Sequence, residues 1–183
     1  MEQTVKRRSS IKIMASMIGL VKPLAHIMAA AVILGTLGYL CAIFLTITAG
    51  YALKAVLSGQ AVTGFFKILV ILAVARGILH YAEQYCNHFI AFKLLAIIRH
   101  QIFAALRKLC PAKLDGKEKG NLISIITTDI ELLEVFYAHT ISPIMIAILT
   151  SLIMVVFIGH FHVYAGIFAA CAYSICLLYT SDA

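Results

Sequence analysis

Four polar side chains recur along one stripe of an otherwise apolar stretch of the sequence. Arg76, His80, Glu83 and Asn87 follow the spacing i, i+4, i+7 and i+11. On an α-helix this spacing places them within about 40° of one another. A guanidinium, an imidazole, a carboxylate and an amide on one line can bind a polar substrate along its path. They can equally form a polar clamp between packed helices, and both interpretations stay open.

His88 lies on a neighbouring stripe of the same stretch, with Tyr81 and Gln84. A histidine in a membrane helix can ligate haem, relay a proton or pack against its neighbours, and the pattern alone favours packing. His160 and His162 are two possible metal ligands in one turn. Two ligands are too few for a site, so we predict no metal centre.

Two further kinds of site are absent from the sequence. The cysteines at positions 41, 86, 110, 171 and 176 form no CxxC pair, and most lie in apolar stretches. We therefore expect small packing residues rather than disulfides or a zinc site. No G-x-x-x-x-G-K-[ST] phosphate loop occurs, so this sequence has no motif that would hold ATP by that means. We expect no catalytic residue.

The composition indicates a protein whose solvent is a lipid bilayer. Hydrophobic residues make up 62% of the 183 residues and charged residues 13%, whereas a soluble domain is about half apolar and about a quarter charged. One soluble core could not bury this much apolar surface. The net charge of +7 accompanies no aromatic-basic motif, which excludes nucleic acid as the expected partner. We predict an all-α, polytopic helical membrane protein.

The apolar stretches predict about four membrane helices, near residues 23–53, 64–110, 127–158 and 163–180. The second stretch contains no proline before Pro111. As one helix it would be about 70 Å long, more than twice the bilayer core of about 30 Å, so part of it must project into water. Pro143 should kink the third helix. Short outer loops are expected at 54–63 and 159–162.

Positive charge is distributed unequally between the two sides of these helices. Residues 1–22 contain five Lys/Arg and residues 93–119 contain seven, whereas the two outer loops share one. By the positive-inside rule, the N-terminus and the hairpin between helices two and three are cytosolic. Residues 1–22 also carry an apolar face, which suits a basic amphipathic helix on the inner leaflet.

The hairpin at 111–129 contains a recognisable signature. Gly120 and Leu122 are followed by Asp129 with the spacing G-x-L-x(6)-D. This pattern, after a basic lead and a long second helix, resembles the membrane domain of type I ABC exporters. The resemblance implies that the hairpin contains a coupling helix that docks on a nucleotide-binding domain. The coupling residues would be Gly120, Asn121, Leu122, Ile123 and Asp129.

A finer resemblance concerns the run from Arg76 to His88 and the stretch from Pro111 to Pro143. Both are similar to CydC, one subunit of heterodimeric exporters of cysteine and glutathione that are linked to cytochrome bd assembly. The resemblance implies thiol export across a bacterial inner membrane, and a haem-ligating histidine at His88. The R-Y-x-E-R run of that subunit reads His80-Tyr81-Ala82-Glu83-Gln84 here, without either arginine.

A half-transporter of this family has six crossings followed by a nucleotide-binding domain, whereas this sequence ends near the fourth crossing. We therefore expect residues 23–183 to be a partial, N-terminal piece of such a membrane domain. The implied partners are a nucleotide-binding domain, a second transporter half and the lipid bilayer. ATP and Mg²⁺ would bind only in the complete protein.

Three alternatives remain open. The first is a small four-helix membrane protein that binds haem, with His88 as one axial ligand and a second ligand from another helix. The second is an ABC exporter of other substrates. The third is a structural or assembly subunit with neither haem nor an ATPase partner.

Overall fold

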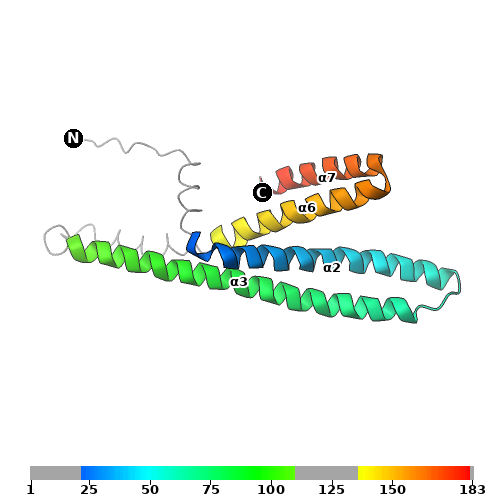
Figure 1. The fold of residues 1–183 in the computed structure, drawn as a ribbon, viewed down its shortest axis with the longest axis horizontal. Coiled ribbons are helices and arrows are strands. Elements are labelled where there is room, and N and C mark those ends of the chain that lie inside the picture. The colour runs from blue at the N-terminus through cyan, green and yellow to red at the C-terminus, as the bar shows by residue number, and fades with distance from the viewer. Residues whose placement is uncertain (1–21, 110–135, 182–183) are drawn as a thin grey trace.

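The computed structural model describes residues 22–109 and 136–181, and every element in those ranges is helical. The long helices run roughly along one axis (Figure 1). The elements are η1 (Lys22–Leu24), α2 (Ala25–Leu57), α3 (Thr63–Leu109), η3 (Tyr137–Ile141), α6 (Ser142–Phe161) and α7 (Val163–Ser181). The prediction of an all-α fold is confirmed.

The α2 and α3 helices form a long antiparallel pair that lies side by side in Figure 1. They contain 33 and 47 residues, which correspond to about 50 Å and about 70 Å at 1.5 Å per residue. The sequence predicted the second helix at 64–110, and α3 occupies Thr63–Leu109 without an internal proline. The residue-109 end of α3 extends past the start of α2 (Figure 1).

A Schellman motif ends α2 four residues later than the expected residue 53. The Gly59 N–H donates to the Val56 carbonyl at 3.0 Å, and the Gln60 N–H donates to the Ala55 carbonyl at 2.9 Å. Gly59 adopts φ +68°, which a glycine accepts without steric cost. Residues 54–57 contain no glycine or proline, so the helix has no local reason to stop before Ser58.

The third crossing begins irregularly. The π-helical segment η3 leads directly into α6, and Pro143 lies in the first turn of α6. Proline is tolerated there because the first N–H groups of a helix have no partner within it. Pro143 was expected to kink the third helix from within; the structure places it in the first turn of α6, after the π-helical segment η3, and the kink stays a prediction. Residues 127–135 of the expected helix lie outside the described residues.

The α6 and α7 helices form a tight hairpin in which only His162 is not helical. Its N–H donates to the Ile158 carbonyl at 3.1 Å, and its own carbonyl accepts from the Gly166 N–H at 3.0 Å. Gly159 and Gly166 bring the two backbones into contact, because a Cβ atom on Gly166 would lie 2.6 Å from the Gly159 Cα. The expected four-residue turn is therefore a single residue.

The described helices have the lengths and surfaces of a membrane protein. Three spans are long and apolar enough to cross a bilayer: α2, most of α3, and His139–Phe161. The fourth helix, α7, is apolar but shorter. Large apolar side chains on all four helices are exposed, including Ile33, Ile71 and Tyr164, as expected for surfaces that face lipid. The predicted polytopic membrane fold is confirmed.

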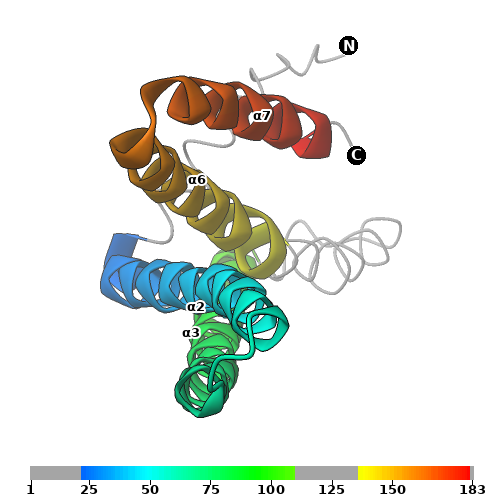
Figure 2. The ribbon, with the colours of Figure 1, turned by 90° about the vertical axis from the view of Figure 1, so that its right-hand side faces the viewer.

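The helices are layered, as Figure 2 shows from one end. The α6 helix packs on α2, and α7 packs on α6. A buried apolar cluster of Leu24, Ile90 and Leu94 joins η1, just before α2, to α3. Partly buried Phe136 and Ile141 pack against this cluster from the beginning of the third crossing. This cluster fixes the helices at one end of the polar stripe of α3.

Candidate functional site

Three helices meet at Gly35. This residue of α2 is buried, and a Cβ atom built on it would run into Ile146 Cδ1 of α6. The same Cβ atom would lie 3.2 Å from Glu83 Cγ of α3. Glycine leaves room here for side chains of both neighbouring helices, and any larger residue would require Ile146 to move. The contact therefore places Glu83 and Ile146 at the same level of the molecule.

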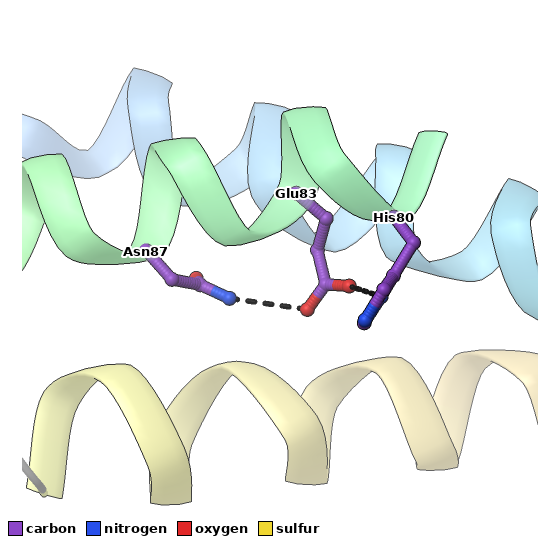
Figure 3. A network of polar contacts seen from close by, with 3 residues as sticks. All are labelled: His80, Glu83 and Asn87. Carbon is purple, nitrogen blue, oxygen red and sulfur yellow. Dashed lines mark hydrogen bonds and ion pairs between the residues drawn. The ribbon is translucent and has the colours of Figure 1, made fainter. Parts of the chain in front are cut away.

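A network of polar contacts on α3 lies at this level, and Figure 3 shows its three side chains directed to the side where α6 lies. Glu83 is only 5% exposed. Its Oε2 atom lies 3.0 Å from His80 Nδ1, and its Oε1 atom accepts a hydrogen bond from Asn87 Nδ2 at 3.1 Å. An unpaired buried carboxylate would be costly, and these contacts give each of its oxygens a partner.

Asn87 of the network and Ser142 of α6 are fully buried and incompletely bonded. Asn87 is 2% exposed and Ser142 is 0% exposed. Asn87 Oδ1 and Ser142 Oγ have no hydrogen-bond partner among the residues that the structure describes. The α3 and α6 helices run antiparallel. Asn87 lies one turn after Glu83, and Ser142 lies one turn before Ile146. Both steps lead toward the same end of the molecule, so we expect Asn87 and Ser142 at one level, one turn away from Gly35.

A small hollow opens on the other side of Glu83. Its volume is about 80 Å³, and its walls are Gly35, Gly38, Tyr39, Arg76, His80 and Glu83. Within residues 22–109 and 136–181, the Arg76 guanidinium has no ion-pair partner. The structure thus brings Arg76, His80 and Glu83 to one hollow. Asn87 does not line it and instead holds the Glu83 carboxylate from the adjacent turn.

A larger cavity of about 300 Å³ lies between α2, α6 and α7. Most of its wall is apolar, with Ile146 and Ala147 from α6 and the rings of Tyr39 and Tyr173 on either side. Thr150 also lines it, and its buried Oγ1 atom has no hydrogen-bond partner in the described part of the chain. Tyr39 lines both this cavity and the hollow beside Arg76.

Sequence reasoning missed the contribution of α2 and α6 to this site. Ser142, Ile146 and Thr150 follow the spacing i, i+4 and i+8, so one face of α6 could have been identified as polar at two positions. Gly35 and Tyr39 are also four residues apart. No local signal could show that these two faces meet the stripe on α3, because that depends on how the helices pack.

His88 lies apart from the hollow and contacts a second histidine. Its ring centroid is 5.9 Å from that of His139 in η3, with the planes at 75°, and 6.1 Å from that of Phe92. The contact brings together two histidines that are distant along the chain. The assignment of His88 as a haem ligand stays a prediction.

Several expected sites fall beyond what the structure describes. The expected coupling residues Gly120, Asn121, Leu122, Ile123 and Asp129 all lie in the undescribed range 110–135. The amphipathic lead, apart from Lys22, lies in the undescribed range 1–21. Within the described residues, no three His, Cys, Asp or Glu side chains are grouped to hold a metal ion. Cys41, Cys86 and Cys171 are free thiols.

Comparison with known proteins gives one family and two relatives. Residues 25–180 match the family model of the ABC transporter transmembrane region. A probable ABC transporter ATP-binding/permease protein of Haemophilus influenzae is 45% identical over 170 residues, which are 91% of this chain and 31% of that protein. The glutathione/L-cysteine transport system ATP-binding/permease protein CydC of the same organism is 26% identical over 85 residues, 46% of this chain and 15% of that protein. The chain spans less than a third of the length of either relative.

Proposed function

The chain belongs to the ABC transporter transmembrane region family, and from that premise we propose that it supplies membrane-crossing helices to an ATP-driven exporter. The observation that carries this proposal is the family match across 25–180, which includes all the described helices except η1 and the last residue of α7. The relatives are named as ATP-binding/permease proteins, which supports a nucleotide-binding domain as the partner.

The length of α3 supports a mechanical link to that partner. About 30 Å of a helix is enough to cross the bilayer core, whereas the 47 residues of α3 extend about 70 Å. The residue-109 end carries Arg107 and Lys108 in its last turn, as suits a helix end in water on the cytosolic side. This end leads directly into the 110–135 range of the proposed hairpin.

The coupling contact itself is proposed at Gly120, Asn121, Leu122, Ile123 and Asp129, on the signature that they share with type I ABC exporters. Closure of the nucleotide-binding domains around ATP would move this contact. The rigid helices on either side of the hairpin would then carry the displacement to the junction at Gly35. A second transporter half, in a heterodimer, would complete the path.

The substrate path is proposed along Arg76, His80, Glu83 and Asn87. Three of these residues line the hollow beside Gly35, and the fourth holds the Glu83 carboxylate in place. Within a membrane span, ionisable residues that face a cavity are typical of a route for polar solutes. A cationic Arg76 at the hollow suits a substrate that carries negative charge.

Cysteine or glutathione is the finer proposal for the substrate, with a link to cytochrome bd assembly. Its support is the likeness to CydC, which covers 46% of this chain at 26% identity. The more similar relative is named without a substrate. The proposed location is a bacterial inner membrane, with the N-terminus and hairpin in the cytosol, and its support is the excess of Lys and Arg in those segments.

Leu122→Glu tests the coupling role. Inside-out membrane vesicles containing the assembled transporter would be assayed for ATP hydrolysis and for accumulation of radiolabelled glutathione and cysteine. We expect hydrolysis to continue and accumulation to be lost, because a charge at the contact prevents docking. Leu57→Glu is the matched control, since Leu57 is 81% exposed and lies at the end of α2 that is far from the proposed hairpin. Undiminished accumulation in Leu122→Glu would count against the docking role.

A further inference from the structure

The hollow and the larger cavity have different chemistry but share a wall. Tyr39 lines both spaces. Ile146 lines the larger one and packs against Gly35, which lines the smaller. Tyr39 is therefore common to both spaces, and Ile146 connects the lining of the larger space to Gly35 of the smaller one. A single molecule could extend from one space into the other past Tyr39.

Charge determines which chemical group suits the hollow. Glu83 already has His80 and Asn87 as partners, whereas Arg76 has no ion-pair partner among the described residues. An uncompensated guanidinium within a membrane span is costly. An acidic group would compensate it, and the planar guanidinium can donate two parallel hydrogen bonds to a carboxylate or phosphate.

Shape and polarity determine what suits the larger cavity. Its volume of about 300 Å³ lies at the lower end of the range of small-molecule sites, roughly 300–1,000 Å³. Ile146, Ala147 and the faces of Tyr39 and Tyr173 offer contacts to an apolar body. Thr150 and Ser151 also belong to the lining of this cavity. Such a wall does not satisfy a fully polar solute.

We propose that the two spaces together bind an amphipathic organic anion, with its acidic group at Arg76 and its apolar body between α2, α6 and α7. The inference rests on the proposed exporter function and takes the alternative in which the exporter carries substrates other than cysteine and glutathione, because it names the class of molecule that the path would take. A free organic acid and an anionic lipid share this chemistry. A small polar amino acid would occupy the hollow and leave the larger cavity unused.

Fluorescence titration of the full chain in phosphatidylcholine nanodiscs tests the site. The probe is dansylglycine, which joins a carboxylate to an apolar naphthalene body, and the comparison probe is dansylamide, which lacks the carboxylate. The chain contains no tryptophan, so its own emission interferes little with either probe. We expect saturable binding of dansylglycine, about tenfold tighter than that of dansylamide, because a hydrogen bond to a charged group is lost with the carboxylate.

Substitutions at Arg76 and Ala147 test the binding of the acidic group and of the apolar body separately. In Arg76→Gln, dansylglycine should bind no more tightly than dansylamide, while Arg76→Lys should keep part of the preference. Ala147→Phe fills the larger cavity and should abolish saturable binding of both probes. Ala172→Phe is the matched control, because Ala172 is exposed on α7 and does not line the cavity. It should bind both probes as the unmodified chain does.

Two results would overturn the proposal. One is equal binding of the two probes by the unmodified chain, and the other is unchanged binding in Ala147→Phe. Competition by phosphatidylglycerol added to the nanodiscs would identify a lipid as the source of the anion, and its absence would indicate a free acid. The titration uses no ATP, so it is independent of export. A chain that binds dansylglycine in this way but supports no transport would refute the exporter role alone.

Discussion

Two regions of the molecule bring helices together by opposite means. At the junction of α2, α3 and α6, Gly35 accepts the end of the Ile146 side chain and the stem of Glu83. In the hairpin of α6 and α7, Gly166 meets the backbone of Gly159 directly. The junction is thus a contact between side chains over a glycine, and the hairpin is a contact between two backbones.

The difference determines how each region can respond to movement. A side-chain end changes position by rotation about its χ angles, so the junction can adjust without moving a helix. Two backbones in contact cannot adjust in that way. We infer that the junction, which borders the hollow, is the adaptable region, and that the hairpin moves as one body. The four substitutions below test this contrast.

The largest effect is expected from Gly166→Ala. The new Cβ atom would lie 2.6 Å from Gly159 Cα and 3.1 Å from Gly159 N, and both are backbone atoms that cannot move away alone. We expect a loss of about 3 kcal/mol, the upper end for overpacking, because α6 and α7 must separate. Equilibrium unfolding in mixed detergent micelles measures the loss. Spin labels on α6 and α7 would report whether the helices separate, and an unchanged distance with full stability would contradict the backbone contact.

The next largest effect is expected from Glu83→Leu. The substitution removes the partner of Asn87 Nδ2, and since Asn87 Oδ1 already has none among the described residues, it leaves a buried amide without a hydrogen bond. We expect a loss of about 2 kcal/mol, typical of an orphaned buried polar group. Glu83→Gln is the control, since its amide oxygen can still accept from Asn87 and should retain most of the stability. A leucine variant as stable as the glutamine variant would show that the network contributes nothing to packing.

A smaller and reversible effect is expected from Gly35→Ala. Its Cβ atom would meet Ile146 Cδ1, which is the far end of a flexible side chain. We expect a loss of about 1 kcal/mol, because Ile146 can rotate away at some cost. Ile146→Val removes Cδ1 and should restore stability in the double variant. Failure of this rescue would place the strain at the Cγ1 atom of residue 146 or at Glu83 Cγ, both of which remain in the double variant. It would weaken the contrast with the hairpin.

The smallest effect, with the opposite sign, is expected from Gly50→Ala. No atom lies within 4 Å of the Cβ position at Gly50 among the described residues. Alanine favours a helix over glycine, so we expect a gain of about 0.5 kcal/mol. The same unfolding assay measures it. A loss at Gly50 would mean that glycine substitutions are harmful in this protein regardless of contact, and would remove the basis of the comparison.

The sequence predicted the parts of this molecule that depend on local pattern. Composition indicated a helical membrane protein, and the spacing of Glu83 and Asn87 placed both on one helix face, where they form a hydrogen bond. The sequence could also have predicted that α2 ends at Leu57 rather than at residue 53. Ser58-Gly59 is a local signal for the end of a helix, and it is a stronger signal than the charge of Lys54. Helix existence therefore followed from periodicity and charge.

The rest depends on packing between distant segments. Nothing around Gly35 indicates that Ile146, more than a hundred residues later, will press against it. The pairing of His88 with His139 likewise arises from two elements that are separated along the chain. Arg76, His80 and Glu83 were expected on one stripe, but the hollow that they line needs the glycines and Tyr39 of α2.

The single-residue connection at His162 has a consequence for how the protein enters its membrane. Only one extended residue connects α6 and α7. This connection is too short for one helix to insert while the other remains at the membrane surface. The backbone groups at the turn are already bonded to Ile158 and Gly166, so the turn itself carries few unsatisfied groups across the bilayer. The two helices are therefore suited to concerted insertion as a preassembled pair, and α7, although short, can follow its more apolar neighbour into the lipid.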